Sequence, residues 1–199
     1  NAGTTCTGTP ITFTITVNPT PTVNAVANQV VCNGAPTTAV TFSGAVPGTV
    51  FNWTNNTTSI GLAASGTGNI ASFNAVNTTN APVVATITVT PSYTNGGVTC
   101  TGASRTFTIT VNPTPTVNTV ANQVVCNGAP TTAVNFTGFV PGTVYNWTNS
   151  NTSIGLAASG TGNIASFNGV NTGIVPAVAT ITVTPTYTNG GVTCTGAPI

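Results

Sequence analysis

Five cysteines are the residues of this chain whose type and spacing best suit covalent chemistry. They are Cys6, Cys32, Cys100, Cys126 and Cys194, in a chain of 199 residues. A zinc site is a poor alternative, because the cysteines lie far apart, no CxxC motif occurs and the chain has no histidine. We therefore expect disulfides, which persist in oxidising compartments and predict a secreted or surface location.

Acid–base chemistry is almost absent from the composition. The chain contains no Asp, Glu, His or Lys, and Arg105 is its only charged side chain. General acid–base catalysis, calcium sites and phosphate clamps all depend on these residue types. The sequence therefore predicts a protein that is not an enzyme, holds no metal or cofactor and does not bind nucleic acid.

The composition also favours a folded chain outside the membrane. The chain is 40% apolar and nearly neutral, whereas disordered segments combine low hydrophobicity with high net charge. Thr, Asn, Gly or Pro interrupts every apolar stretch before it reaches about 18 residues, so we expect no membrane insertion.

A period of 94 residues organises the whole sequence. The stretch TFTITVNPTPTV occurs unchanged at 12–23 and 106–117, and residues 12–105 share about 79 identities with residues 106–199. We interpret this stretch as the last strand of one repeat followed by a joint to the next. The predicted parts are residues 1–18 as the final strand of a preceding repeat, 19–112 as a complete repeat, and 113–199 as a second repeat that lacks its final strand.

Within one repeat, apolar and polar residues alternate with the period of two that is typical of half-buried strands. ITFTITV at 11–17 and ATITVT at 85–90 show this pattern most clearly. The copies differ at 41, 43 and 45 but match at 40, 42 and 44, which indicates one exposed and one buried face. Other predicted strands are 28–32, 38–42, 49–54, 59–62 and 69–76. About seven short strands a repeat predict an all-β fold of tandem immunoglobulin-like β-sandwich domains.

Turn and joint positions follow from Gly, Asn and Pro. Asn95-Gly96-Gly97 predicts a tight hairpin between residues 85–94 and 106–111. Proline removes a backbone donor and keeps the chain extended, so the Pro-Thr-Pro motifs predict stiff connectors between domains. These interdomain joints contain Pro19, Pro21, Pro113 and Pro115.

Two regular disulfide pairings fit the repeat. In the first, Cys32 pairs with Cys100 and Cys126 pairs with Cys194, which leaves Cys6 alone. In the second, Cys6 pairs with Cys32 and Cys100 pairs with Cys126, which leaves Cys194 alone. We favour the first as structural disulfides, because tandem sandwiches normally leave a domain at the end opposite their entry. The 26-residue segment of the second pairing holds a full strand and a joint, so its ends should lie far apart.

Two tryptophans and the threonine rows allow a binding interpretation beside a structural one. Trp53 and Trp147 lie in FNWTN and YNWTN. An exposed Trp is able to stack on a sugar, but a Trp on a central strand of a sandwich normally belongs to the core, and we predict core aromatics here. Regular Thr rows suit ice binding, but Thr is also simply favoured on exposed strand faces.

The surface carries almost no charge, so neighbouring copies neither repel nor steer one another. Such a surface suits a long array or a laterally associating fibre. The alternative is that other segments of a longer chain carry the charge. Predicted partners are therefore neighbouring repeats of the same chain, with like chains in a filament as a further option.

The combination of VCNG, FNWTN, SIGLAASGTGNIASF, ATITVTP, CTG and TFTITVNPTPTV resembles the PKD-like repeats of giant surface adhesins in Bacteroidota, of the SprB-type gliding-motility kind. The resemblance covers nearly the whole chain. It implies immunoglobulin-like sandwiches in tandem, export by the type IX route and a place on the bacterial cell surface.

From these features we predict a segment of an extracellular stalk or filament, whose tandem domains give reach for adhesion or gliding. An alternative is a carbohydrate- or ice-binding module. We further expect the chain to be a stretch of a longer array. The alternative is a donor-strand fibre, in which the spare strand at 1–18 fills the incomplete repeat of a neighbouring chain by β-augmentation.

Overall fold

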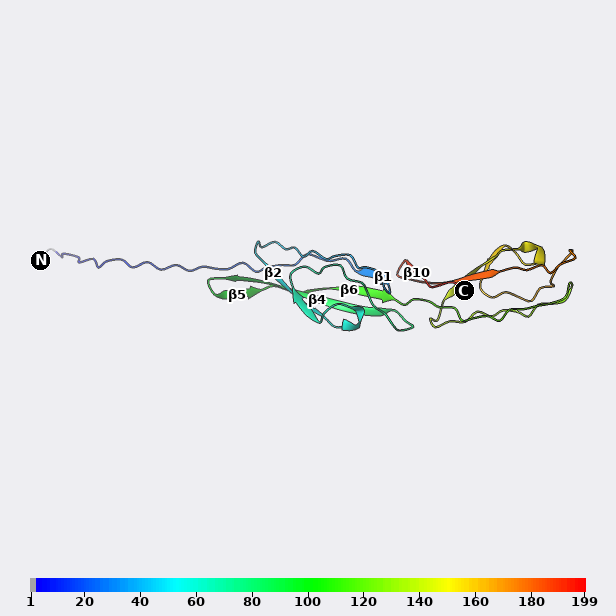
Figure 1. Cartoon of the computed structure of the whole chain (residues 1–199). Helices are drawn as coiled ribbons and strands as arrows, with labels where there is room; N and C mark the ends of the chain where they lie inside the picture. Colours follow the sequence, from blue (N-terminus) through cyan, green and yellow to red (C-terminus); the bar gives the residue numbers. More distant parts are fainter. Residues whose placement is uncertain (1–2) are drawn as a thin grey trace.

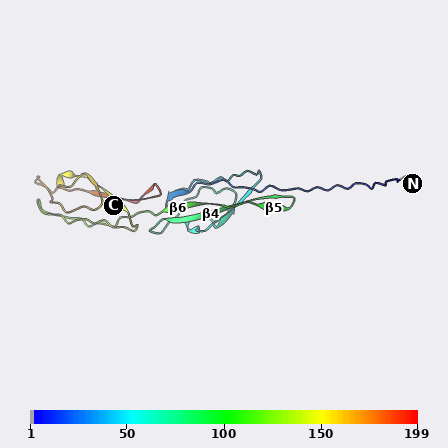
Figure 2. The ribbon, with the colours of Figure 1, turned by 180° about the vertical axis from the view of Figure 1, so that it is seen from behind.

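The computed structural model describes residues 3–199 as an elongated, almost entirely β structure. Residues 19–112, the first repeat, and residues 113–199, the second repeat, follow one another along a single axis (Figure 1). The view from behind shows the same arrangement, with residues 3–18 extending away from the first repeat (Figure 2). We call residues 3–18 the tail. The predicted all-β sandwich fold is confirmed.

The first repeat is organised around one sheet with the strand order β1-β6-β4-β2-β3, in which β5 also pairs with β4. All neighbours are antiparallel except β1 and β6, which run parallel. The strands are β1 (Gln29–Cys32), β2 (Val50–Asn55), β3 (Ser65–Thr67), β4 (Val83–Asn95), β5 (Val98–Thr101) and β6 (Arg105–Asn112).

The long strand β4 has two partners on the same edge, one after the other. Its first half pairs with β6, from Val83 opposite Val111 to Val89 opposite Arg105. Its second half forms a hairpin with β5 through Gly96 and Gly97, whose φ angles of 58° and 78° suit a tight turn. The predicted hairpin is therefore correct in its turn, but the strand β5 comes between that turn and β6.

The second layer of the sandwich consists of extended segments rather than long ladders. Val40 bridges Ile70 and Pro36 bridges Asn74, and these bridges are the only regular pairing of the strands predicted at 38–42 and 69–76. The Asn69 side chain accepts a hydrogen bond from the Phe42 backbone N–H at 2.9 Å, which takes the place of a ladder bond. The prediction of a strand at 59–62 is wrong. The chain there forms the 3-10 turn η1 (Thr58–Ile60), which ends at Gly61 with a φ of 95°.

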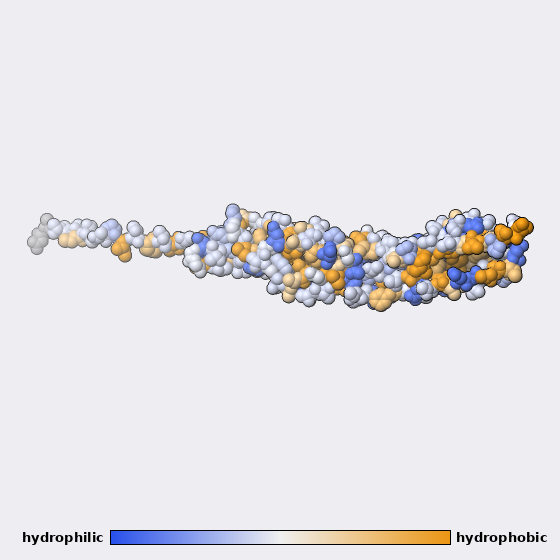
Figure 3. Space-filling view, viewed as in Figure 1, coloured by the Kyte–Doolittle hydropathy of each residue, from blue (hydrophilic) through white to orange (hydrophobic). Residues whose placement is uncertain are grey.

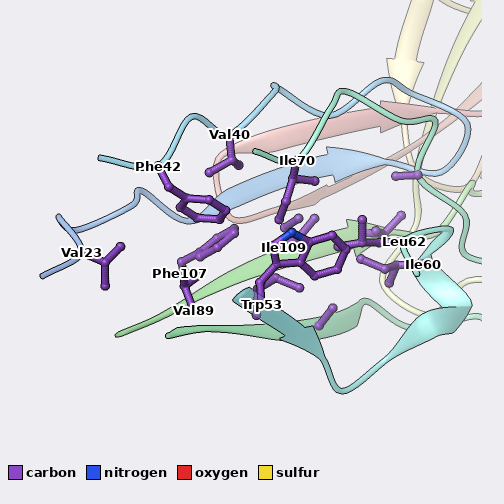
Figure 4. Packing of buried hydrophobic residues seen from close by; sticks show 14 residues of the cluster. Val23, Val40, Phe42, Trp53, Ile60, Leu62, Ile70, Val89, Phe107 and Ile109 are labelled. Carbon is purple, nitrogen blue, oxygen red and sulfur yellow. The ribbon is translucent and has the colours of Figure 1, made fainter. Parts of the chain in front are cut away.

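The core of the first repeat lies between these two layers (Figure 4). Phe42 packs against Phe107 and Phe51 with ring centroids 6.4 and 5.8 Å apart. Val40 and Phe42 are buried whereas residues 41, 43 and 45 are exposed, which confirms the alternation read from the two copies. The other core residues include Val23, Trp53, Ile60, Leu62, Ile70, Ile87, Val89, Ile109 and Val111.

The second repeat has the same plan with fewer strands. Its sheet has the order β10-β9-β7-β8, with η2 (Thr152–Ile154) after β7. The β7–β9 register reproduces the β2–β4 register 94 residues on, so Trp147 lies opposite Val183 as Trp53 lies opposite Val89. The strands are β7 (Val144–Asn149), β8 (Ser159–Thr161), β9 (Ile181–Asn189) and β10 (Val192–Thr195).

The two repeats differ at one edge. In the first, β6 lies between β1 and β4; in the second, no described strand takes that place, and residues 123–126 form no strand. Ile199 exchanges two backbone hydrogen bonds with Val183, at 2.9 and 3.1 Å, in the position that Arg105 occupies opposite Val89. The strand predicted at 11–17 is extended but pairs with no described strand.

Within residues 3–199, the only helical elements are the two three-residue turns, and none has the length and apolar character that crossing a membrane requires.

Candidate functional site: the joint between the repeats

A disulfide between the two repeats is the main covalent feature of the structure. Cys32, the last residue of β1, is bonded to Cys194 on β10, with a Cα–Cα distance of 5.6 Å. The two bonded cysteines are 162 residues apart in the sequence, which is one period of 94 residues more than the 68-residue separation in the pairing that we favoured. Both predicted pairings are therefore wrong: the bond neither closes a single repeat, as Cys32–Cys100 and Cys126–Cys194 would, nor joins residues 26 apart.

The direction of β1 explains this correction. β1 runs parallel to β6, so Cys32 lies beside Asn112, at the end where the chain leaves the first repeat. Cys100 lies opposite Tyr93, on the hairpin at the other end of β4. Val83 and Tyr93 are ten residues apart on that strand, which is roughly 33 Å at 3.3 Å per residue. A bond between Cys32 and Cys100 would have to span the repeat, whereas the β9–β10 hairpin of the next repeat lies close to Cys32.

Asn112 connects both sides of the joint through its amide. Its side-chain N–H groups donate to the backbone oxygens of Asn189 and Val192 at 3.0 and 3.5 Å, and its Oδ1 accepts from the Asn189 side chain at 2.9 Å. Its backbone oxygen accepts from the Asn33 N–H at 2.9 Å. Asn112 is fully buried, so these partners supply the hydrogen bonds that burial demands.

The predicted joint prolines lie at this contact. Pro113 and Pro115 are fully buried, whereas Pro19, the equivalent of Pro113, is exposed beside the tail. Pro115 and its equivalent Pro21 pack closely on a glycine of the following hairpin, since a Cβ on Gly196 would lie 1.8 Å from the Pro115 carbonyl oxygen. The joint is therefore a packed contact rather than a loose linker.

Several predicted residues lie away from the joint. Trp53 and Trp147 lie in the two cores, each 7% exposed. Cys6, Cys100 and Cys126 are free thiols. Across residues 3–199, no three His, Cys, Asp or Glu side chains lie close enough together to hold a metal ion.

The asparagines are the functional residues that sequence reasoning missed. Asn112 and Asn189 are unchanged from Asn18 and Asn95, and each flanks a predicted turn or joint. The available signal was that the asparagines beside Pro-Thr-Pro and in Asn-Gly-Gly are identical in the two copies of the repeat. That signal became specific only when the fold placed the two motifs against each other.

No protein-family model matches the chain, and no curated protein emerges as its relative. The joint's own geometry is therefore the basis for a function.

Proposed function

We propose that this chain is a load-bearing segment of an extracellular stalk or filament of a bacterial surface adhesin, whose repeats provide reach for adhesion or gliding. The observation that carries the proposal is the Cys32–Cys194 disulfide, because it joins consecutive repeats. The in-line arrangement of the repeats and the buried joint also support it. The disulfide favours an oxidising location, in keeping with the cell surface and type IX export that the resemblance implies.

The bond changes how a pulling force travels through the chain. A load applied between the tail and Ile199 passes from Cys32 directly to Cys194 through the sulfur atoms. Residues 33–193 lie inside this covalent loop, so they remain folded or unfold without lengthening the chain. Most core residues of both repeats lie within this loop and are thereby removed from the path of the load, whereas Val23 lies before Cys32 and stays on that path. Such an arrangement suits a stalk of fixed length.

Single-chain force spectroscopy tests this role. With the 199-residue chain held by its two ends, the oxidised protein should lack most of the extension that 162 residues give, roughly 570 Å at 3.5 Å per residue. Reduction with dithiothreitol should restore that extension. The same extension in oxidised and reduced protein would contradict the load-bearing role.

Two variants provide matched controls. Cys32→Ser should extend fully without any reductant, because it removes the bond. Cys6→Ser removes a free thiol of the tail and should keep the limited extension of the parent protein.

The carbohydrate-binding alternative finds little support in the aromatic residues. Trp53 and Trp147 are buried in the cores, so their ring faces are covered by protein rather than open to a sugar. A glycan array with the whole chain tests this alternative, and saturable binding would favour it over the stalk.

A further inference from the structure

Arg105 is the only charged side chain in the sequence, and it lies on the surface of the first repeat. The chain has no Asp or Glu, so the Arg105 guanidinium has no side-chain carboxylate with which to pair. Because Lys and His are also absent, the strongly hydrophilic residues coloured deep blue in Figure 3 are, apart from Arg105, the uncharged amides Asn and Gln. A partner that recognises a cationic side chain therefore finds a single target in this sequence.

The fold does not require arginine at this position. Arg105 begins β6 and lies opposite Val89. The equivalent position of the second repeat holds Ile199, which makes the corresponding backbone pair with Val183. Isoleucine also stands at the equivalent position 11. The positive charge is thus a property of one site rather than of the repeat, and the strand pairing does not depend on it.

The chain around Arg105 is exposed and has a free strand edge. Residues 102–104 form no strand, and residues 103–106 are all exposed. Arg105 pairs with β4 alone, because β1 first meets β6 where Gln29 lies opposite Ile109. An open hollow of about 320 Å³ lies beside it, lined by Thr22, Val23, Ala103, Ser104 and Arg105. A free edge of this kind allows another protein to bind the segment by strand addition.

We propose that Arg105 is a cleavage site for an arginine-specific endoprotease, and that the Cys32–Cys194 disulfide keeps the cleaved stalk in one piece. A protease of this class carries a carboxylate in its S1 pocket, which pairs with the guanidinium that the chain itself leaves unpaired. Arg105 is the end residue of the β4–β6 ladder, so local opening of the strand end presents the bond. The protease adds one water molecule across the Arg105–Thr106 peptide bond, which leaves a carboxylate on Arg105 and an amine on Thr106.

The disulfide joins the two products of this cleavage. Residues 1–105 contain Cys32, and residues 106–199 contain Cys194. A disulfide within the first repeat, such as Cys32–Cys100, would lie wholly in the first product and would let the two products separate. The load that passes through the two bonded sulfur atoms avoids the cleaved peptide bond. The inference rests on the proposed stalk, and it adds resistance to chain scission to that role.

Cleavage also leaves β6 in place. Its residues Phe107, Ile109 and Val111 are buried in the core of the first repeat. β6 pairs with β4 on one side and with β1 on the other, and the Thr108 N–H donates to the Asn28 side-chain oxygen at 2.8 Å. None of these contacts depends on the peptide bond that joins Arg105 to the rest of β6, so the cleaved chain should keep its fold.

Digestion of the folded, oxidised chain with trypsin tests the proposal, because trypsin cleaves after Arg and Lys. Iodoacetamide added before denaturation blocks free thiols and prevents disulfide exchange. Without reductant, the product should stay in one band at 19.6 kDa on denaturing electrophoresis. With dithiothreitol, that band should be lost completely and replaced by residues 1–105 and residues 106–199. The sequence of the shorter product should begin at Thr106.

Two variants provide the controls. Arg105→Ile is the matched variant, because Ile stands at both equivalent positions, and it should stay intact with and without dithiothreitol. Cys32→Ser should be cleaved at the same bond, but its products should separate without any reductant. The cleaved parent chain should keep the circular dichroism spectrum of the uncleaved chain.

Force spectroscopy on the cleaved chain tests whether it still bears load. The cleaved, oxidised protein held by its two ends should show the same limited extension as the uncleaved protein. Addition of dithiothreitol should then break the connection between the two ends, because no covalent bond joins the products any longer.

Three results would overturn the proposal: cleavage only in urea that also unfolds the first repeat, separation of the products without reductant, or loss of the connection when the cleaved, oxidised chain is pulled. The uncleaved chain distinguishes this inference from the stalk on which it rests. Limited extension of the uncleaved protein together with resistance to trypsin would leave the load-bearing role standing and refute the cleavage site. Full extension of the uncleaved, oxidised protein would refute the load-bearing role whatever trypsin does.

Discussion

At the scale of single residues, Trp53 and Gly66 show how one side chain determines its neighbour. The two lie opposite each other on β2 and β3. A Cβ on Gly66 would lie 2.3 Å from Cζ2 of the indole, so only glycine leaves room for the ring. Gly160 and Trp147 repeat the same geometry to a tenth of an ångström. The glycine of each SGT triplet is therefore a packing requirement of the core.

Gly66→Ala should destabilise the first repeat by about 1–3 kcal/mol, the usual cost of overpacking a filled core. The ring cannot move away easily, because Trp53 is itself a buried member of the core. Urea unfolding followed by tryptophan fluorescence measures the change. Gly8→Ala is the control, since a Cβ there meets nothing within 4 Å, and it should leave the midpoint unchanged. An equal loss in both variants would contradict the packing argument.

At the scale of elements, β6 accounts for the difference between two nearly identical repeats. Ala85 and Ile87 are completely buried where β4 pairs with β6, whereas their equivalents at 179 and 181 are partly open. Asn77 shows the same effect: its side chain donates to the Val111 oxygen at 2.7 Å in the first repeat, whereas the side chain of the equivalent Asn171 bonds only to its near neighbours Val175 and Gly173. Two nearly identical repeats are thus ordered differently according to whether this strand is present.

Amide hydrogen exchange should expose this asymmetry. We expect amides of residues 83–87 to exchange at least about tenfold more slowly than those of residues 177–181, since one backbone hydrogen bond contributes about 1 kcal/mol and burial adds to it. β2 and β7 provide the internal control, because their pairings are the same in both repeats and their rates should agree. Equal rates at 83–87 and 177–181 in the single chain would show that β6 protects nothing.

At the scale of the whole molecule, the absence of acidic and basic side chains removes the usual causes of pH-dependent stability. Acid unfolding arises mainly from carboxylates and histidines whose pKa values differ between folded and unfolded states. This chain has neither. Its stability rests on apolar packing, backbone pairing and one disulfide, all of which are insensitive to protonation over most of the pH range.

The free energy of unfolding should therefore vary by less than about 1 kcal/mol between pH 4 and 8, and should barely respond to sodium chloride. Above about pH 10 it should fall, because burial raises the pKa of the Tyr145 hydroxyl above its ordinary 10.0. The folded state then holds a proton that the unfolded state has lost, so stability decreases as the pH rises. Urea titrations across the pH range measure this.

The chain supplies the control for that alkaline loss, because the equivalent residue of the first repeat is Phe51. Tyr145→Phe should lessen the decrease above pH 10 while leaving stability at pH 7 close to that of the parent. A steep acid transition near pH 4 in either protein would contradict the account.

Several features of the fold depend only on the local side-chain pattern and on the repeat, so they could be predicted from the sequence. The period of 94, the buried and exposed faces at 40–45, the strands predicted at 49–54 and 85–94, and the Asn-Gly-Gly turn all follow from side-chain alternation and from glycine's access to positive φ. These are short-range effects, so neighbouring residues carry the information. The all-β sandwich fold follows from their sum.

Which ends of the strands meet is a property of the tertiary fold and could not be predicted from the local pattern. The repeat period shows that Cys32 and Cys194 occupy the two different cysteine positions of the repeat. It does not predict the parallel pairing of β1 with β6 that brings Cys32 to the joint. Alternation equally predicts strands at 11–17 and 106–111, yet only the second has partners on both sides. Strand direction and the supply of a pairing edge are long-range properties. They depend on which segments are present to pack, and a local pattern does not contain that information.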